Sequence, residues 1–482
     1  MINNRKGLSW VLFARIALIV VLLTGFFSSP FIGELSADTD KQKDEIVNLI
    51  INNHVSGIER SKLNTENIDT IISSLGDPYT QYFTPDEWKQ FMDMLENNYV
   101  GIGIRLGQDE YGFYVNEVFP GTPALDAGMQ GGDYIIAVEG KATKGITTDE
   151  LISQITGVEG TEVRITIQRE KKEIKLTLAR KAIHIPALTS RLFDNGTGYI
   201  RISSFSSDAD ELFATQLKDM QSKGLKSLVI DLRNNPGGLL DSAAGMATQF
   251  IKKGSLIHTV DRTKKETAYP INGVDPLTLP VTVLVNEYSA SASEVLAGAL
   301  QDYNLATIMG TQTYGKGSVQ SLFTLSEGGM LKLTIQEYLT PLKHKVNQVG
   351  ITPDLNVYGD VSQLITGLQH AGPIDIELSL TQHSLSINGQ SFNDRFKVIR
   401  EQEVIYVPSR ILAAIVEENI AWEASTRSVR IGKQSDIGSF LAGEEQGLKL
   451  IDGTSYISLN EFKAQFPSFD WQDNNGQLLL IE

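Results

Sequence analysis

The chain has 482 residues, 41% of them hydrophobic and 21% charged, and it carries a formal net charge of -16. At about 150 residues per domain this length predicts roughly three globular domains, and the acidic balance argues against nucleic-acid binding, which needs a basic patch. The absence of cysteine excludes disulfides, thiol catalysis and cysteine metal ligands, and the six histidines include no HExxH-type pair, so a zinc hydrolase is not expected.

The first 37 residues have the pattern of a targeting segment. Arg5 and Lys6 precede an apolar stretch whose uninterrupted part, residues 16–23, is shorter than a membrane span and is typical of a signal peptide. Leu35-Ser36-Ala37 is a weak cleavage site, which slightly favours a retained membrane anchor. We therefore expect the rest of the chain to be extracytoplasmic, anchored in the membrane or, alternatively, secreted after cleavage.

Residues 38–97 are predicted to be helical. Within them Thr84-Pro85-Asp86-Glu87 is a helix start, with a capping threonine, a proline at the first position and a glutamate at the third. Residues 98–180 change to short strands and glycine turns, begin with Gly101-Ile102-Gly103-Ile104, and end in a predicted hairpin. This part is expected to be a separate β-rich domain.

Residues 181–357 alternate strands and helices. Apolar runs at 225–232 and 281–285 predict buried strands, each followed by a helix, and this alternation predicts an α/β layer with a parallel sheet. Residues 358–374 are expected to be a linker helix. Residues 375–482 contain an internal repeat of strand, helix, tryptophan strand and final strand, which predicts a small α+β domain or two tandem ones. The chain as a whole is predicted to be multidomain α/β.

The serine-rich segment at 289–294 and the glycine-rich segment at 315–320 carry the chemistry. Ser291 lies between an apolar strand and a helix, and Lys316 lies between two glycines. Serine becomes a nucleophile only when a neighbour takes its proton, and lysine can do this only if burial lowers its pKa. The two segments therefore predict a Ser-Lys hydrolase. The alternative is structural: Ser291-x-x-Glu294 is also a helix capping box, and an isolated lysine is usually a solvated one.

Several motifs in one order make the chain resemble the carboxy-terminal processing peptidases, or tail-specific proteases, over about residues 40–357. The motifs are short segments spread along the chain: Gly76-Asp77-Pro78-Tyr79, Gly101 to Ile104, Tyr199 to Ile202, Asp231-Leu232-Arg233-Asn234-Asn235-Pro236-Gly237-Gly238, Ser289 to Glu294, Gly315-Lys316-Gly317-x-Val319-Gln320, and Gly350-Ile351-x-Pro353-Asp354. The resemblance implies an embedded PDZ domain and a Ser-Lys protease core.

The resemblance implies that Ser291 is the nucleophile, that Lys316 is the general base and that Gln320 orients the lysine, with Ser289 and Ser293 in turn and cap roles. An oxyanion needs preorganised donors. They are expected from backbone N–H groups that lie in a glycine loop and at a helix start: Gly237, Gly238 and Ala292.

The PDZ-like loop is expected to bind a substrate's free C-terminal carboxylate while the peptide adds as a strand. Its residues are Gly101, Ile102, Gly103 and Ile104, and the two isoleucines suggest a pocket for an apolar last residue. Arg169, at the end of a PDZ-like strand, is proposed to contact the protease core when a tail is bound. No cofactor and no metal are expected.

Two departures from the family pattern stand out. Lys343 stands where the family usually has a glycine, two residues after Pro341, which puts the local loop shape in doubt. The C-terminal region resembles the copper amine oxidase N-terminal-like stalk domains of some exported proteins and implies no copper. Expected partners are protein or peptide substrates with free apolar C-termini, a second copy bound through the N- and C-terminal regions, and the cell envelope. The alternatives are a PDZ scaffold or chaperone, and a cell-envelope binding protein with little proteolysis.

Overall fold

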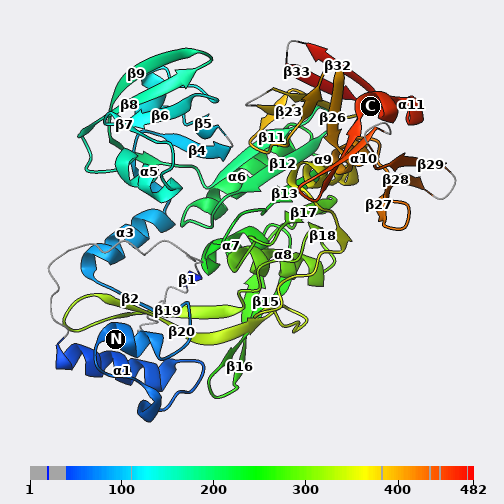
Figure 1. Cartoon of the computed structure of the whole chain (residues 1–482). Coiled ribbons are helices and arrows are strands. Elements are labelled where there is room, and N and C mark those ends of the chain that lie inside the picture. Colours follow the sequence, from blue (N-terminus) through cyan, green and yellow to red (C-terminus); the bar gives the residue numbers. More distant parts are fainter. Residues whose placement is uncertain are drawn as a thin grey trace, which may run out of the picture.

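The computed structural model describes residues 19–20, 39–109, 111–381, 384–433, 436–443, 447–474 and 476–482. The predicted targeting segment, apart from the backbone of Ile19–Val20, lies outside the described residues. Within the described ranges, no helix combines the length and the apolar character that crossing a membrane requires. Figure 1 shows the PDZ-like region and the C-terminal region above an α/β core, with the N-terminal helices below it.

The N-terminal region is mainly helical, as predicted. Its elements are α1 (Asp40–Asn53), the 3-10 turn η1 (Arg60–Lys62), α2 (Ile68–Ser73), β2 (Gln81–Phe83) and α3 (Pro85–Leu95). The helix start predicted at Thr84 is confirmed, because Thr84 and Glu87 form a reciprocal capping box. Ile46, Ile50 and Ile71 pack with Leu331 and Leu333 of a long strand of the core. The N-terminal helices therefore support one of the core sheets.

The β-rich domain is a twisted sheet with two helices. Its strands run in the order β4-β5-β6-β8-β9, with β7 beside β6. The elements are β4 (Ile104–Asp109), β5 (Gly112–Val118), α4 (Pro123–Asp126), β6 (Tyr134–Val138), β7 (Lys141–Ala142), α5 (Thr148–Ile155), β8 (Glu162–Arg169) and β9 (Lys172–Ala179). The chain enters through β3 (Asn98–Gly101) and leaves through β10 (Lys181–His184), which pair with each other. The edge strand β4 follows the predicted carboxylate-binding loop.

The core contains the predicted parallel sheet. Its order is β11-β12-β13-β17-β18-β21, with all pairs parallel except β11–β12. The strands are β11 (Leu188–Leu192), β12 (Thr197–Ile202), β13 (Ser227–Asp231), β17 (Val281–Val285), β18 (Thr307–Gly310) and β21 (Leu355–Asn356). One face packs on α6 (Ala209–Ser222), α7 (Leu240–Ala247) and α8 (Ala292–Asp302). The strand and helix expected around residues 281–302 are thereby confirmed.

The other face of this sheet is covered by α9 (Asp360–Ala371), which lies in the segment expected to be a linker helix. The helix is buried along much of its length, through Val361, Leu364, Ile365 and Leu368. At Gly367 it approaches β17 closely, since an added Cβ would lie 2.7 Å from Leu284 Cδ2. This helix is therefore part of the core.

An antiparallel sheet lies beside the parallel one. Its order is β14-β1-β19-β20-β15-β16, and β2 also pairs with β20. The strands are β1 (Ile19–Val20), β14 (Gly238–Leu239), β15 (Lys253–Asp261), β16 (Glu266–Asn272), β19 (Ser318–Thr324) and β20 (Met330–Leu339). Strand β14 follows the glycine loop of the parallel sheet, and β19 follows Lys316. The two predicted halves of the site thus meet where the two sheets meet.

The C-terminal region shows the predicted repeat. Its elements are β22 (Glu377–Leu380), β23 (Leu385–Ile387), β24 (Gln390–Phe392), β25 (Ile399–Glu401), β26 (Val404–Pro408), α10 (Ser409–Ile415), β27 (Ile420–Glu423), β28 (Ser428–Lys433), β29 (Asp436–Leu441), β30 (Leu448–Ile451), β31 (Thr454–Ser458), α11 (Leu459–Gln465), β32 (Asp470–Asn474) and β33 (Gln477–Ile481). The first strands of the two repeat units, β26 and β31, pair antiparallel. The repeat therefore builds one joined α+β domain.

Candidate active site

Ser291 lies on a sharp turn between β17 and α8. Its backbone has φ 63° and ψ -116°, which is a rare conformation for a residue with a side chain. Such a conformation costs about 1–3 kcal/mol and persists only where the surroundings enforce it. A strained strand-to-helix turn is also how hydrolases present a nucleophilic serine. The structure therefore places Ser291 in a nucleophile-like position.

The two neighbouring serines have structural partners. Ser289 Oγ donates to Leu232 O at 2.8 Å and accepts from the N–H of Asn286 at 2.9 Å. Ser293 Oγ donates to Asn235 O at 2.9 Å. These bonds fit the turn role expected for Ser289, whereas Ser293 binds a carbonyl of another loop and does not cap the helix. Both serines tie the Ser291 turn to the loop that carries the two glycines.

Glu294 joins the serine turn to the lysine loop. Its Oε2 accepts from the backbone N–H of Ser291 at 2.8 Å and from that of Lys316 at 2.9 Å. Its Oε1 accepts from Thr313 Oγ1 at 2.6 Å and from the N–H of Gly315 at 2.7 Å. Burial raises the pKa of Glu294, against these hydrogen bonds, which lower it. The sequence gives only the capping-box signal for Glu294; its role in joining two distant segments was missed.

Lys316 is fully buried. Desolvation, assisted by the positive charge of Lys332, holds its pKa well below the usual range. Its Nζ lies 4.7 Å from the centroid of the Tyr79 ring. Lys332 is itself buried between aromatic rings, and burial lowers its pKa to about 8. Lys316 thus has the property that a general base needs, because its amine loses its proton at a lower pH than that of an exposed lysine.

The motif around Asp77, for which the sequence suggested no chemistry, acts on the pKa of the lysine. Burial raises the pKa of Asp77, but hydrogen bonds from His54, Thr80 and Thr334 outweigh it and bring the pKa to about 2. Thr80 Oγ1 donates to Asp77 Oδ2 at 2.6 Å. Asp77 is therefore an anion at neutral pH, and its charge opposes the lowering of the lysine pKa.

Gln320 is also fully buried. Its Nε2 donates to Ser318 Oγ at 3.0 Å and to Thr334 Oγ1 at 3.2 Å. Within the described part of the chain, its Oε1 has no hydrogen-bond partner. Because the amide nitrogen is held by two hydroxyls, the acceptor oxygen has a fixed direction, which is what an orienting residue requires. Its role toward Lys316 stays a prediction.

The glycine loop lies against Ser291. A Cβ added at Gly237 would lie 2.8 Å from Ser291 Cβ and 2.9 Å from its Oγ, and Gly237 has φ +108°. The N–H of Gly237 donates to Asn235 Oδ1 at 2.9 Å. This bond makes Gly238 the better candidate of the two for an oxyanion donor. Ala292 is the first residue of α8, where the N–H groups of a helix lack intrahelical partners.

A two-residue strand lies between the two halves of the site. Ile19 pairs antiparallel with Leu239 of β14 and with Gln320 of β19, and Val20 pairs with Gly238. In Figure 1 this strand, labelled β1, lies near the centre of the molecule. The space between β14 and β19 can therefore hold an extended backbone directly beside the glycine loop.

The predicted carboxylate loop leads into the edge strand β4. Gly103 has φ +89°, and a Cβ there would lie 2.2 Å from Thr122 Cβ, so only glycine fits. The carbonyls of Ile102 and Gly103 accept from the N–H groups of Ala124 and Phe119. Ile102 is buried in the domain core, and Ile104 is half-buried. The loop is thus held rigidly at the start of an open sheet edge, as peptide capture by strand addition requires.

The structure bears on the predictions made for Arg169 and for Lys343. Both guanidinium ends of Arg169 bind Asp133 within the PDZ-like domain, at 2.7 and 2.8 Å, so its proposed contact with the core is not made in this structure. Lys343 adopts φ +67°, the left-handed conformation that glycine favours. Its N–H donates to Thr340 O at 2.8 Å, so the loop keeps the turn despite the substitution.

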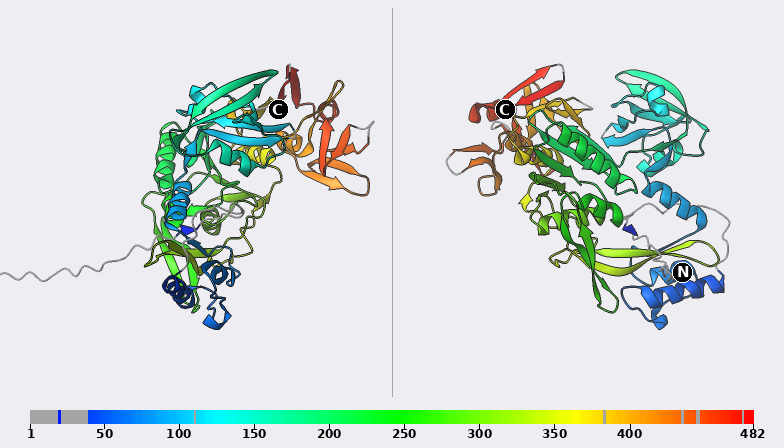
Figure 2. Two further views of the ribbon diagram at one scale, coloured as in Figure 1. Left: turned by 60° about the vertical axis from the view of Figure 1, so that its left-hand side comes forward. Right: turned by 180° about the vertical axis from the view of Figure 1, so that it is seen from behind.

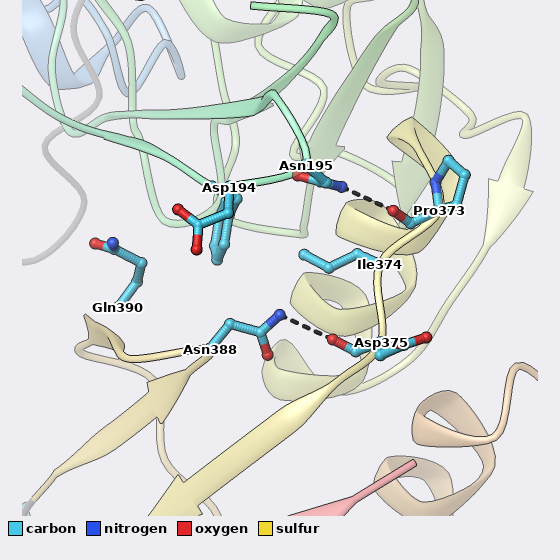
Figure 3. A pocket seen from close by; sticks show the side chains of 8 residues that line it. Asp194, Asn195, Pro373, Ile374, Asp375, Asn388 and Gln390 are labelled. Atoms are coloured by element: carbon cyan, nitrogen blue, oxygen red, sulfur yellow. Dashed lines mark hydrogen bonds between the residues drawn. The ribbon is translucent and has the colours of Figure 1, made fainter.

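A cavity of about 460 Å³ lies away from these residues, at the junction of the core with the C-terminal domain. Figure 3 shows it between Asn195, whose amide donates to Pro373 O, and Asn388, whose amide donates to Asp375 O. No chemistry of the candidate site involves it. No group of three or more metal-ligating side chains occurs in the ranges that the structure describes.

Comparison with known proteins gives matches to both the PDZ-like domain and the core. A model of peptidase family S41 matches residues 196–357, and a PDZ domain model matches residues 89–168. A probable CtpA-like serine protease of Staphylococcus aureus is 35% identical over 346 residues, which are 71% of this chain and 70% of that protein. A carboxyl-terminal-processing protease of Synechocystis is 33% identical over 318 residues, 64% of this chain and 74% of that protein.

A solved structure of a putative S41 protease from Bacteroides fragilis is similar in fold, with a TM-score of 0.50 at 18% identity over 67% of this chain and 92% of that one. Fold and relatives together define a multidomain serine-type peptidase with an embedded PDZ domain. The chain belongs to peptidase family S41, among the carboxyl-terminal-processing serine proteases. The resemblance stated from the motifs is confirmed, and a non-catalytic PDZ scaffold is not supported.

Proposed function

We propose that the chain is an exported endopeptidase that recognises apolar C-terminal tails through its PDZ domain and cleaves peptide bonds with a Ser291–Lys316 dyad. One observation carries the dyad: a single carboxylate oxygen of Glu294 accepts from the backbone N–H groups of both residues. Serine acts as a nucleophile once its proton has a neutral acceptor, and burial makes Lys316 such an acceptor.

The reaction follows from these positions. Ser291 Oγ attacks the scissile carbonyl carbon while Lys316 Nζ accepts the hydroxyl proton, and the carbonyl oxygen gains the negative charge. Backbone N–H groups of Gly238 and Ala292 stabilise that oxyanion. Lys316 then returns the proton to the leaving amine, and an acyl-enzyme on Ser291 remains until water, deprotonated by the same lysine, hydrolyses it. Gln320 orients the lysine through its amide oxygen.

Substrate binding is proposed to use two strand additions. The tail adds to β4, with its carboxylate at the loop of residues 101–104. The segment to be cut lies between β14 and β19, where the pairing of Ile19 with both strands supports an extended backbone. An extended backbone brings the scissile bond past Gly238 and Ser291 without the need for a fixed side-chain sequence.

The tail specificity has a direct test. Residues 39–482 are incubated with an unstructured protein that ends in an apolar residue, with the same protein amidated at its end, and with one that ends in an acidic residue. The free apolar tail is expected to be cleaved fastest, because both other ends lose a partner in the loop or the pocket. Equal cleavage of all three would contradict tail recognition, and equal cleavage by the Ser291→Ala variant would contradict the dyad.

Export and anchoring are proposed from the first 37 residues. Arg5 and Lys6 followed by the apolar stretch support both. Fractionation of cells that express the full chain is expected to place it in the membrane fraction, accessible to added protease from outside. Recovery in the cytoplasm would contradict export, and recovery in the medium without residues 1–37 would replace the anchor by a cleaved signal.

A further inference from the structure

The C-terminal domain touches both the PDZ domain and the protease core through one short loop, residues 393–395, which follows β24. In the turned view at the left of Figure 2, the PDZ strands lie beside the C-terminal domain above the core. We propose that this 393–395 loop couples the PDZ domain to the glycine loop beside Ser291, with Asp394 as a positioning residue for Arg233. The coupling rests on the proposed function, since it acts on the proposed oxyanion site.

Two residues of the 393–395 loop bind the PDZ domain on strand β5. Asn393 Nδ2 donates to Glu117 Oε2 at 3.1 Å. Arg395 donates to Asn116 Oδ1 at 2.9 Å, and its guanidinium lies 4.5 Å from the centroid of the Tyr114 ring. Asn393 and Arg395 thus hold three neighbouring side chains of β5, so a movement of β5 is transmitted to the loop.

Strand β5 is the neighbour of the strand that is proposed to receive the tail. Glu117 Oε2, which Asn393 binds, also accepts from Arg105 Nε of β4 at 3.1 Å. Val118 pairs with Ile104, the last residue of the carboxylate loop. A peptide added to β4 therefore lies one strand away from the contacts of Asn393 and Arg395.

The middle residue of the loop, Asp394, points the other way, into the core. Its side chain is only 6% exposed, and its Oδ1 lies 3.2 Å from Arg233 Nη2. Its Oδ2 lies 3.9 Å from Arg201 Nη1 and has no hydrogen-bond partner among the described residues. A buried carboxylate oxygen without a hydrogen bond is costly. A shift of the loop toward Arg201 would satisfy it, and this shift is the second arrangement that the proposed coupling uses.

Arg233 connects Asp394 to the glycine loop. The guanidinium is fully buried and binds Asp231 in a bidentate manner, at 2.9 and 2.5 Å. The chain continues directly into Asn234, whose N–H donates to Asn286 Oδ1 at 2.9 Å, and then to Gly237 against Ser291. Arg201 and Arg233 share the two acids Asp231 and Asp394, so loss of the Asp394 charge leaves an excess buried positive charge at the start of this loop.

The test measures how an occupied PDZ domain affects a second substrate. Residues 39–482 cut a short fluorogenic peptide with an amidated end, with and without a free apolar tail peptide that keeps its peptide bonds but is too short to reach Ser291 from the PDZ domain. The tail peptide is expected to change kcat by at least about fivefold, the lower range of typical coupling between sites. In Asn393→Ala and Arg395→Gln, the ratio of kcat with the tail peptide to kcat without it is expected to fall to unity. The affinity for the tail peptide, measured by fluorescence anisotropy, should stay within about twofold of wild type.

Asp394→Asn is expected to lower kcat about tenfold at unchanged KM and to abolish the tail effect, since it misplaces the glycine loop without touching substrate. Asp394→Glu should recover part of the effect. Asp473→Asn is the matched control, because Asp473 pairs with Arg400 inside the C-terminal domain. It should behave as the wild type. If Asp394→Asn does not fold, the flanking variants Asn393→Ala and Arg395→Gln, which alter only contacts between domains, still test the coupling through the effect of the tail peptide on kcat.

A readout that needs no catalysis separates this proposal from the proposed function. Hydrogen exchange on the Ser291→Ala chain should show that the tail peptide alters the amides of residues 234–238, and that Asn393→Ala and Arg395→Gln abolish this change. A tail peptide that leaves kcat and these amides unchanged in the wild type overturns the coupling. So do flanking variants that respond as fully as the wild type. Cleavage by Ser291→Ala overturns the dyad alone.

Discussion

The serine half and the lysine half of the site are built by different physical means. Ser291 is fixed by hydrogen bonds and by an unusual backbone conformation at the end of a parallel strand. Lys316 is fixed by burial, under an aromatic ring and near a second buried lysine. A nucleophile must be held at a defined position relative to the substrate, whereas a base must have a pKa low enough to be neutral when it accepts a proton. The difference implies that the serine half should respond to changes in geometry and the lysine half to changes in charge and solvent access.

The largest effect is expected from substitutions that remove the reactive side chain of either half. Ser291→Ala and Lys316→Ala should each reduce kcat at least about 10³-fold, because nucleophile and base act as a unit. Circular dichroism should show a retained fold. Ser289→Ala and Ser293→Ala are the matched controls, and their activity should stay within about tenfold of wild type, since their hydroxyls bind only carbonyl and amide groups of the loops. A Ser291→Ala chain that cleaves normally would refute the assignment.

Glu294→Gln tests the geometric half. A carboxylate accepts all four donors, but an amide presents its own N–H groups to two of them, so the serine turn and the lysine loop should separate. A loss of about 10²-fold in kcat is expected, which is what a misplacement of about 1 Å can cost. Glu287→Gln is the matched control, because Glu287 is exposed and, among the described residues, its carboxylate accepts a hydrogen bond only from Thr311. Unchanged steady-state kinetics of Glu294→Gln would show that Glu294 does not join the halves.

The pH profile tests the lysine half. Because the pKa of Lys316 is lowered, kcat should rise with pH through that pKa and level off above it, falling about tenfold per pH unit below it. The charges that set the position are Lys332, which lowers the pKa, and Asp77 and Glu294, which raise it. Single-turnover rates, which isolate chemistry, are the measurement. A profile that is flat from acidic to alkaline pH would exclude a lysine base.

Lys332→Gln is expected to have the smallest effect on the maximal rate, and it tests one interaction, the charge of Lys332 on Lys316. Removing this positive charge should raise the pKa of Lys316, so the rising limb of the profile should move to higher pH while the plateau stays nearly the same. Lys345→Gln is the matched control, because Lys345 is exposed. A limb that stays in place, or one that moves to lower pH, would mean that Lys332 does not tune the base.

The sequence predicted the parts of this site that lie in short motifs. Ser291, Lys316 and the glycine loop each carry a local signal, as do the strand and helix around the serine, and the repeat of the C-terminal domain is visible from its two tryptophans. The comparisons confirm the family and the class of enzyme. The roles of the individual residues stay predictions, since these comparisons do not test them.

What the sequence could not show depends on contacts between distant segments. Glu294 reads as a helix cap because its other donors lie 19 to 22 residues away. Tyr79 reaches Lys316 only because the N-terminal region packs on β20, and Lys332 lies near Lys316 because β20 pairs with β19. The segment 358–374 could be read more closely, since Val361, Leu364, Ile365 and Leu368 have the spacing of a buried helix face.

The placement of α9 has a consequence for how this protein is divided. Its apolar face belongs to one continuous cluster that contains Val229, Leu284 and Met309 of the parallel sheet together with Leu378, Leu412 and Leu480 of the C-terminal domain. The two cores share this cluster, so their unfolding should be a single cooperative event. A chain ended at residue 357 would expose that sheet face to water. The parallel sheet that carries the site motifs therefore depends on α9 and the C-terminal domain for its stability.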